Sequence, residues 1–301
     1  MRQHIDESDF EALKEKRVFV TGSSGYVGGE LVRHLHANGI SVFGADRLAD
    51  ASECLDLCDA DATRAVLEEF RPDLLIHLGT HSALAYQNTF LDAFRDDSQS
   101  IVNLLSYLEG SPDSRLVFFA SSYVYSGLDT AQRWDESAAL NSNHNFGVAK
   151  SFFEQLLLRV HPSTVIFRLS SVFGPGNALH PNAIANMAQE CMQDGELTIW
   201  GRGTRKMQYV FIDDVLKYIL RSAQLASGIY NLGGHEYETV AQTANAIAMH
   251  FDSKAVFLED KTEGQTLPFM ENKKLIAEVG QDFFTPFLTA LPNYLDTLKK
   301  Q

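Results

Sequence analysis

Three glycines, at positions 22, 25 and 28, separate a short apolar run from a helix-like stretch near the start of the chain. The run 17–21 is predicted to be a buried strand, and residues 26–38 are predicted to be a helix. Glycines in such a turn let the backbone approach a pyrophosphate closely, and the free N–H groups that open the helix favour the anion. The sequence therefore predicts a strand–loop–helix unit that binds a dinucleotide.

Short apolar runs alternate with longer amphipathic stretches through the first half of the chain. Continuous apolar strands separated by helices indicate an α/β fold with a doubly wound parallel sheet of the Rossmann type. After about residue 170 the rhythm becomes irregular. We therefore expect residues 1–170 to form a dinucleotide-binding domain, and residues 171–301 to form mainly a smaller mixed α/β substrate lobe, with the chain crossing between the two. Strands are predicted at 17–21, 40–45, 74–78, 116–120, 165–169, 197–200 and 210–212, and helices at 26–38, 62–70, 91–108, 146–160, 183–193, 240–251 and 287–298.

The charge balance excludes some classes of partner. Twenty-five Lys and Arg residues stand against 39 Asp and Glu residues, which gives a formal net charge of −14. Such an acidic chain repels phosphate backbones, so we expect no nucleic-acid partner. No apolar run reaches the roughly 18 residues that span a bilayer, and the polar residues 1–16 are expected to form a surface extension. The cysteines suit neither a disulfide framework nor a metal site, which favours a cytoplasmic protein; they are Cys54, Cys58 and Cys191.

An acidic residue follows the second predicted strand. Asp46 lies about twenty residues after the glycine loop, where a carboxylate accepts hydrogen bonds from ribose hydroxyls and repels a 2′-phosphate. This favours NAD over NADP. The neighbouring Arg47 favours NADP instead, because an arginine at this place can pair with the 2′-phosphate.

Candidate catalytic residues lie after the fourth predicted strand and at the start of the helix 146–160. Phe146 and Lys150 are one helical turn apart on the same face. A lysine there can bind the nicotinamide ribose and lower the pKa of a neighbouring phenol. Ser121 follows the strand 116–120 at its carboxyl end, where ligands of open α/β sheets bind. We take Ser121, Phe146 and Lys150 as candidate catalytic residues, and Ser122 and Tyr123 as candidate substrate contacts.

These motifs together resemble the extended short-chain dehydrogenase/reductase family, whose NAD-dependent epimerases and dehydratases act mainly on nucleotide sugars. The resemblance covers nearly the whole chain. It implies that a substrate hydroxyl is oxidised by hydride transfer to NAD, and that the protein forms a homodimer through the helices 91–108 and 146–160. The segments that carry it are 21–28, 56–57, 76–80, 121–125, 168–176, 210–215 and 231–234. The cofactor contacts that we expect are Gly22, Ser24, Gly25, Tyr26, Val27, Gly28, Asp46, Arg47, Asp56, Leu57, Leu78, Gly79, Thr80 and Lys150.

Phe146 departs from the family pattern, which has a tyrosine at this place. Phenylalanine has no ionisable proton, so this form of the chain could be inactive. Three interpretations remain open. The residue could be an introduced Tyr-to-Phe replacement, another group could move the proton, or the chemistry could be lost and leave a binding protein. The candidate replacement groups are Tyr123, Tyr125, His81 and His144.

The substrate side departs from the pattern as well. Ser171 replaces a frequent asparagine, and Met207 replaces an arginine that often clamps the phosphates. The nearby cations Arg202, Arg205 and Lys206 could supply that charge, so we count them with Ser171 as candidate substrate contacts. The leading hypothesis is an NAD-dependent epimerase, dehydratase or reductase acting on a nucleotide sugar. The alternatives are a catalytically silent NAD-binding sensor or scaffold, and a reductase of a non-sugar carbonyl substrate.

Overall fold

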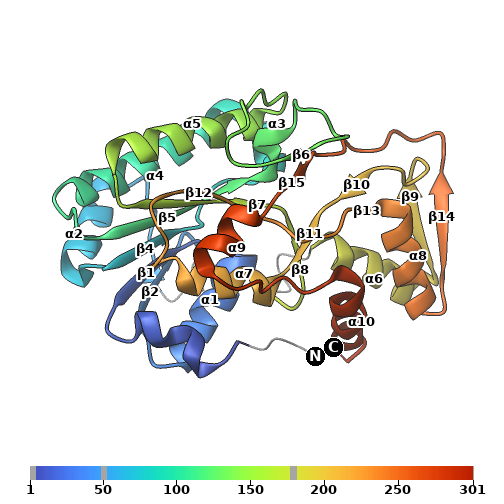
Figure 1. The fold of residues 1–301 in the computed structure, drawn as a ribbon, viewed down its shortest axis with the longest axis horizontal. Coiled ribbons are helices and arrows are strands. Elements are labelled where there is room, and N and C mark those ends of the chain that lie inside the picture. The colour runs from blue at the N-terminus through green and yellow to red at the C-terminus, as the bar shows by residue number, and fades with distance from the viewer. Residues whose placement is uncertain (1–4, 49–52, 177–181, 301) are drawn as a thin grey trace.

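A seven-stranded parallel sheet lies at the centre of the molecule (Figure 1). The computed structural model describes residues 5–48, 53–176 and 182–300. The strands of the sheet are β1 (Arg17–Thr21), β2 (Ser41–Asp46), β3 (Glu53–Cys54), β4 (Leu74–His77), β5 (Arg115–Ser121), β7 (Thr164–Leu169) and β12 (Gly228–Leu232). Their spatial order is β12-β7-β5-β4-β1-β2-β3, and every pair is parallel. The order reverses at β1, so the predicted doubly wound sheet is confirmed, and its switch point lies between β1 and β4.

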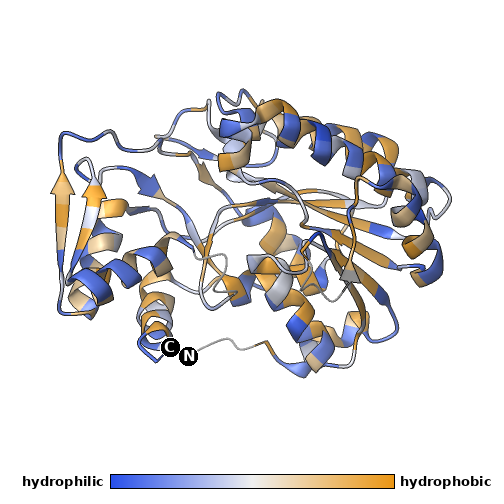
Figure 2. Cartoon of the chain, turned by 180° about the vertical axis from the view of Figure 1, so that it is seen from behind, coloured by the Kyte–Doolittle hydropathy of each residue, from blue (hydrophilic) through white to orange (hydrophobic). Residues whose placement is uncertain are grey.

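Helices cover both faces of this sheet. In Figure 1, α1 (Tyr26–Ala37) and α7 (Ile212–Arg221) lie on one face, and α2 (Ala60–Phe70), α4 (Phe90–Glu109) and α5 (Asn145–Val160) lie on the other. Successive residues of β1 point to opposite sides, so Val18 and Val20 belong to one buried apolar cluster and Phe19 to the other. Figure 2 shows the largely hydrophobic strands enclosed by helices of mixed hydropathy. Within the described ranges, no helix has the length and apolar character needed to cross a membrane.

A smaller lobe lies beyond the carboxyl ends of the strands, on the right in Figure 1. Two short strand pairs organise it: β9 with β14 in parallel, and β10 with β13 antiparallel. The helix predicted at 287–298 is found with those bounds. The elements of this lobe are α6 (Ala183–Asp194), β9 (Glu196–Trp200), β10 (Lys206–Met207), β13 (Glu238–Thr239), α8 (Val240–His250), β14 (Lys254–Leu258) and α10 (Phe287–Leu298).

Two segments of the second half return to the sheet. Strand β12 pairs with β7 over five residues, from Gly228 opposite Val165 to Leu232 opposite Leu169. Helix α7 packs on α1 and on the N-terminal segment. Residues 171–301 are therefore shared between the lobe and the sheet. Short connecting elements join the two parts: α3 (Ala83–Asn88), η2 (Ser122–Tyr125), β6 (Arg133–Trp134), β8 (Ser171–Phe173), β11 (Tyr209–Phe211), β15 (Phe269–Met270) and α9 (Lys273–Val279).

The N-terminal segment is not the surface extension that its polar composition suggested. Residues Glu7–Leu13 form a 3₁₀ helix, η1, which begins with a capping box at Asp6. Phe10 and Leu13 are fully buried and pack into the core cluster that includes α7. Asp9 also forms a 2.7 Å ion pair with Arg221 of α7. The prediction was wrong because two apolar side chains spaced three residues apart are enough to anchor a short helix that is otherwise polar.

Candidate active site

The glycine loop after β1 packs backbone to backbone against the loop after β4. Gly22 has a φ of +68°, and a Cβ added to it would lie 2.8 Å from the backbone N of Gly79. A Cβ on Gly28 would lie 2.1 Å from the carbonyl oxygen of Gly22, so α1 rests directly on the loop. Both positions require glycine for this close approach. The loop therefore presents bare backbone at the start of α1, which is the cradle that a pyrophosphate needs.

The acidic residue at the end of β2 is tied to this loop. Asp46 Oδ2 accepts a hydrogen bond of 3.0 Å from the backbone N–H of Ser24. The next side chain, Arg47, points toward α4, where its Nη1 lies 3.8 Å from Oδ2 of Asp96. The carboxylate of Asp46 is therefore placed at the loop, while the charge of Arg47 is engaged with Asp96.

A cavity of about 320 Å³ lies at this edge of the sheet. Its walls come from the loops after β1, β2, β3 and β4 and from one face of α4. It brings together most of the residues predicted to hold the cofactor, namely Gly22, Gly25, Asp46, Arg47, Asp56, Leu57, Leu78, Gly79 and Thr80. His81, Asp96, Asp97 and Ser100 also line it.

Tyr26 lies elsewhere. Its phenol donates a 2.5 Å hydrogen bond to the carbonyl oxygen of Gly174 and accepts one of 3.0 Å from Asn182. Val27, beside it, is partly buried against the apolar core. The side chains of Tyr26 and Val27, in the first turn of α1, therefore pack away from the cofactor cavity. This turn presents its backbone to the glycine loop.

The serines after β5 start the short helix η2. Ser121 caps it, because its Oγ accepts a hydrogen bond of 3.3 Å from the N–H of Tyr123. Ser122 is buried, and the ring of Tyr123 lies 5.8 Å from that of Phe146. A Cβ on Gly147 would lie 2.2 Å from the carbonyl oxygen of Tyr123, so the start of α5 packs directly on η2. This contact brings the predicted catalytic residues of the two segments together.

Lys150 is buried beneath the aromatic residue at position 146. Its Nζ donates hydrogen bonds to Thr80 Oγ1 at 2.7 Å and to the carbonyl oxygen of Phe119 at 2.8 Å. The same atom lies 5.4 Å from the centre of the Phe146 ring and 4.6 Å from that of Phe118. Burial lowers the pKa of Lys150 to about 8, against the opposing attraction of nearby carboxylates. Thr80 connects this ammonium to the cofactor cavity.

Asp97 is a member of the site that the sequence analysis missed. Asp97 is buried on α4 and accepts hydrogen bonds from His81 and Tyr86. Its negative charge raises the pKa of Lys150 and so partly opposes the effect of burial. A signal for it was present, since the apolar face of this helix runs through Ala93, Ile101 and Leu104 and places position 97 on that face. A carboxylate at a core position requires partners inside the fold, and here the partners line the cavity.

The residues predicted to contact substrate phosphates have other partners. Arg202 Nε lies 3.1 Å from Glu259 Oε2. The loop around Arg202 and Arg205 wraps the carboxylate of Glu263, which accepts hydrogen bonds from the backbone N–H groups of both residues. Lys206 Nζ lies 5.4 Å from the centre of the Tyr237 ring. Ser171 lies apart from this loop, on β8 beside β11.

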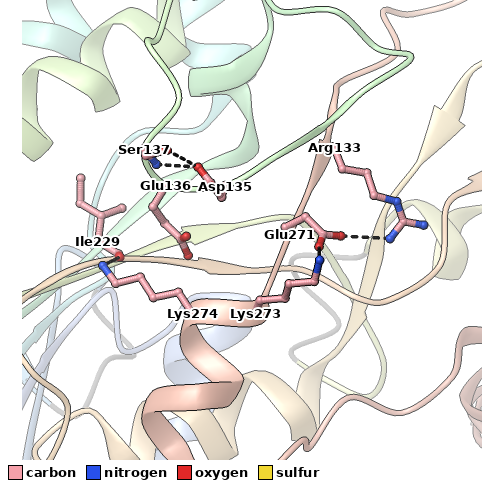
Figure 3. Close-up of a pocket in the computed structure, with 8 residues that line it drawn as sticks. All are labelled: Arg133, Asp135, Glu136, Ser137, Ile229, Glu271, Lys273 and Lys274. Atoms are coloured by element: carbon pink, nitrogen blue, oxygen red, sulfur yellow. Dashed lines mark hydrogen bonds and ion pairs between the residues drawn. The ribbon is translucent and has the colours of Figure 1, made fainter.

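A second cavity, of about 770 Å³, shares no residue with the cofactor cavity. Figure 3 shows three of its charged side chains paired with one another: Arg133 and Lys273 both contact Glu271, at 3.0 and 2.8 Å. Lys274 donates to the carbonyl oxygen of Ile229 and so satisfies one acceptor on the edge strand β12. In the described part of the chain, no group of three or more His, Cys, Asp or Glu side chains could hold a metal ion.

Comparisons with known proteins agree with this geometry. The family model described as "NAD dependent epimerase/dehydratase family" matches residues 18–233. The chain is 26% identical to a GDP-L-fucose synthase of Dictyostelium discoideum, over 93% of this chain and 94% of the relative. It is 23% identical to a dTDP-4-dehydro-6-deoxy-D-allose reductase of Streptomyces bikiniensis, over 77% and 80%.

Solved structures share the fold. A UDP-glucose 4-epimerase of Thermotoga maritima with UDP-glucose superposes with a TM-score of 0.85 at 19% identity, over 94% of this chain and 99% of that one. The same enzyme of Thermus thermophilus, in complex with NAD, gives a TM-score of 0.82 at 22% identity, with the same two coverages. At this identity the likeness establishes the fold alone.

Proposed function

The chain belongs to the NAD-dependent epimerase/dehydratase family, and we propose that it is an enzyme that binds NAD and acts on a nucleotide sugar as an epimerase, dehydratase or reductase. One observation carries this proposal. The glycine loop and Asp46 line a single cavity at the switch point of the sheet, and the buried Lys150 reaches the same cavity through Thr80.

The residues of the cavity fit NAD. The bare backbone at Gly22 and Gly28 would hold the pyrophosphate at the start of α1, and Asp46 would accept hydrogen bonds from the adenosine ribose. Lys150 would hold the nicotinamide ribose. When bound, NAD supplies the acceptor and donor of a hydride.

The protein's own groups position the substrate oxygen. Ser121 accepts a hydrogen bond through its Oγ lone pair, which leaves its hydroxyl hydrogen free to be donated to a substrate hydroxyl or carbonyl oxygen. Phe146 gives this position an apolar surface and no proton. If the chain as given is active, a residue other than Phe146 moves the proton.

Mass spectrometry on a panel of UDP-, GDP-, dTDP- and CDP-sugars incubated with NAD tests the proposal. Product formed by the chain as given supports it and shows that a residue other than 146 moves the proton. Product formed only by a Phe146→Tyr variant identifies a disabled enzyme of the same class. If neither variant forms product, the assignment to nucleotide sugars fails, and a binding protein or a different substrate class takes its place.

A second candidate, a reductase of a carbonyl substrate that carries no nucleotide, is favoured by one observation. The loop expected to bind phosphates already holds the carboxylate of Glu263, and its Arg202 is paired with Glu259. The backbone N–H groups of Arg202 and Arg205 and the Nε atom of Arg202 therefore already have carboxylate partners. Turnover of small ketones together with a failure of UDP to compete would select this candidate.

The protein is also proposed to form a homodimer through α4 and α5. Five large apolar side chains on these helices are about half exposed or more: Leu91, Val102, Val148, Phe152 and Val160. The rings of Phe94 and Phe152 lie 5.7 Å apart and join the two helices into one surface. A second copy of the chain would remove these side chains from water.

A further inference from the structure

We propose that His81, oriented by Asp97, is the acid–base residue of this site and takes the place of the hydroxyl that Phe146 lacks. The proposal rests on the proposed function, because it assigns a role within an NAD-dependent site. It follows from the position of His81, from the hydrogen bonds that fix its ring, and from the engagement of the other candidate groups.

Asp97 fixes both the backbone and the ring of His81. Its carboxylate accepts hydrogen bonds from the backbone N–H of His81 at 3.1 and 3.2 Å and lies 2.7 Å from Nδ1 of the ring. The phenol of Tyr86 donates to the same carboxylate at 2.9 Å. A carboxylate on Nδ1 keeps the proton on that nitrogen, so Nε2 is the basic atom of the neutral ring. The Asp–His pairs of hydrolases use the same logic.

His81 lines the cofactor cavity and directly follows Thr80 in the chain. The Thr80 hydroxyl accepts a hydrogen bond from Lys150, the residue proposed to hold the nicotinamide ribose. The side chain of His81 keeps about a fifth of its surface exposed, whereas Asp97 beneath it is buried. The imidazole is therefore accessible from the cavity, and the group that orients it is not.

Charged groups surround the ring on several sides. Asp96 of α4 lies 3.7 Å from Nε2 and is itself 3.8 Å from Arg47, which follows β2. Asp97 of the same helix lies against Nδ1. Lys150 of α5 is hydrogen-bonded to Thr80, the residue before His81. His77 of β4 stays neutral, because burial and the nearby Lys150 lower its pKa to about 4.

Two of the other candidate groups have hydrogen-bond partners elsewhere, and the third packs against one of them. Burial raises the pKa of Tyr125 to about 12, and its phenol donates to Asn231. His144 caps α5, because its Nδ1 accepts the N–H of Phe146, and burial lowers its pKa. Tyr123 packs against that imidazole, with 4.4 Å between the ring centres. His81 is the candidate whose ring is both fixed by a carboxylate and directed at the cavity.

The chemistry balances with one proton on His81. Oxidation of a secondary alcohol removes a hydride from carbon and a proton from oxygen. The cofactor accepts the hydride, and Nε2 of His81 accepts the proton, which leaves a carbonyl and an imidazolium. The reverse step returns the proton to the oxygen when the carbonyl is reduced.

Cofactor binding tests this role without any substrate. The nicotinamide ring of NAD⁺ is positively charged and that of NADH is neutral, so a protonated His81 beside the ring favours NADH. The dissociation constants of both forms are measured from about pH 5 to about pH 7, a range that spans the usual pKa of histidine and lies below the pKa of Lys150, which is about 8. We expect the preference for NADH over NAD⁺ to rise about tenfold as the pH falls. In a His81→Gln variant, the preference should stay constant.

Tyr123→Phe is the matched control, and it should keep the pH dependence of the native chain. A native preference that does not change with pH overturns the proposal, and so does a His81→Gln variant that retains the change. Loss of the pH dependence in Tyr123→Phe would transfer the role to that phenol. If the folded native chain binds neither NAD⁺ nor NADH, the proposed function itself fails, which distinguishes the two failures.

Discussion

The Nζ atom of Lys150 lies 5.4 Å from the centre of the Phe146 ring, so at position 146 the buried ammonium faces an aromatic ring that carries no hydroxyl. A Phe146→Tyr variant places a phenol near this charge. The ammonium favours the phenolate, so the pKa of the new tyrosine should lie about 1 unit or more below the usual value of 10. The ultraviolet difference spectrum of the variant against the native chain measures it. A Phe146→Tyr, Lys150→Met double variant should lose the effect, and an equal pKa in both would contradict the contact.

Burial of Lys150 makes the stability of the protein depend on pH in the alkaline range. Its folded pKa of about 8 lies below the ordinary 10.5, so between these values the unfolded chain holds a proton that the folded chain has released. The free energy of unfolding should therefore rise with pH across this window, by about 3 kcal/mol relative to Lys150→Met. Urea unfolding of the native chain and of Lys150→Met, at each pH, measures the difference in unfolding free energy. The titration of buried tyrosines affects both chains equally and cancels in this difference. A difference that stays flat would show that Lys150 is solvated.

Asp46 should determine the choice between NAD and NADP. Its carboxylate is held at the glycine loop by Ser24, while Arg47 is drawn toward Asp96. An Asp46→Ser variant removes the charge that repels a 2′-phosphate, and the preference for NAD should fall about tenfold or more. Calorimetric titration with both cofactors measures this ratio. Asp96→Asn is the control that releases Arg47 and leaves Asp46 in place, and an unchanged ratio in Asp46→Ser would remove Asp46 from the specificity site.

Phe152 should contribute to a dimer interface. It is about half exposed on α5 and contacts Phe94 of α4. A Phe152→Glu variant would bury a charge in that interface, so it should elute as a monomer by size exclusion with light scattering. Trp200→Glu, at a still more exposed aromatic side chain on the smaller lobe, should leave the assembly unchanged. A native chain that is already monomeric would end the proposal.

The sequence was sufficient to predict the architecture of the first half. In a continuous apolar run such as 74–78 or 116–120, successive side chains point to opposite faces of the strand, and all of them are apolar. Such a strand is stable when both faces are covered, which is typical of a parallel sheet between two layers of helices. Helix ends were also predictable where a cap or a proline marks them, as before Pro72. The predicted strand at 210–212 lies one residue early in the structure, because Ile212 begins α7.

The rest depends on contacts between distant segments. No local pattern shows that β12 pairs with β7, or that Phe10 and Leu13 pack near α7, because these contacts join residues far apart in the chain. The same holds for the cavity. Asp97 belongs to the site because it bonds to His81 and Tyr86. The carboxylate of Glu263 binds a loop that lies about sixty residues earlier in the chain. Periodicity predicts which face of an element is buried, but it does not identify the partner.

The return of β12 to the sheet has a consequence for how the chain is made. Strand β7 is complete once residue 169 has been synthesised, but its neighbour begins only at residue 228. Until then a growing chain carries the sheet with one backbone edge open, and such an edge can pair with another strand. A fragment that ends before residue 228 would therefore leave β7 as an unpaired edge strand, and the edge of the cofactor half is completed by the second half of the chain.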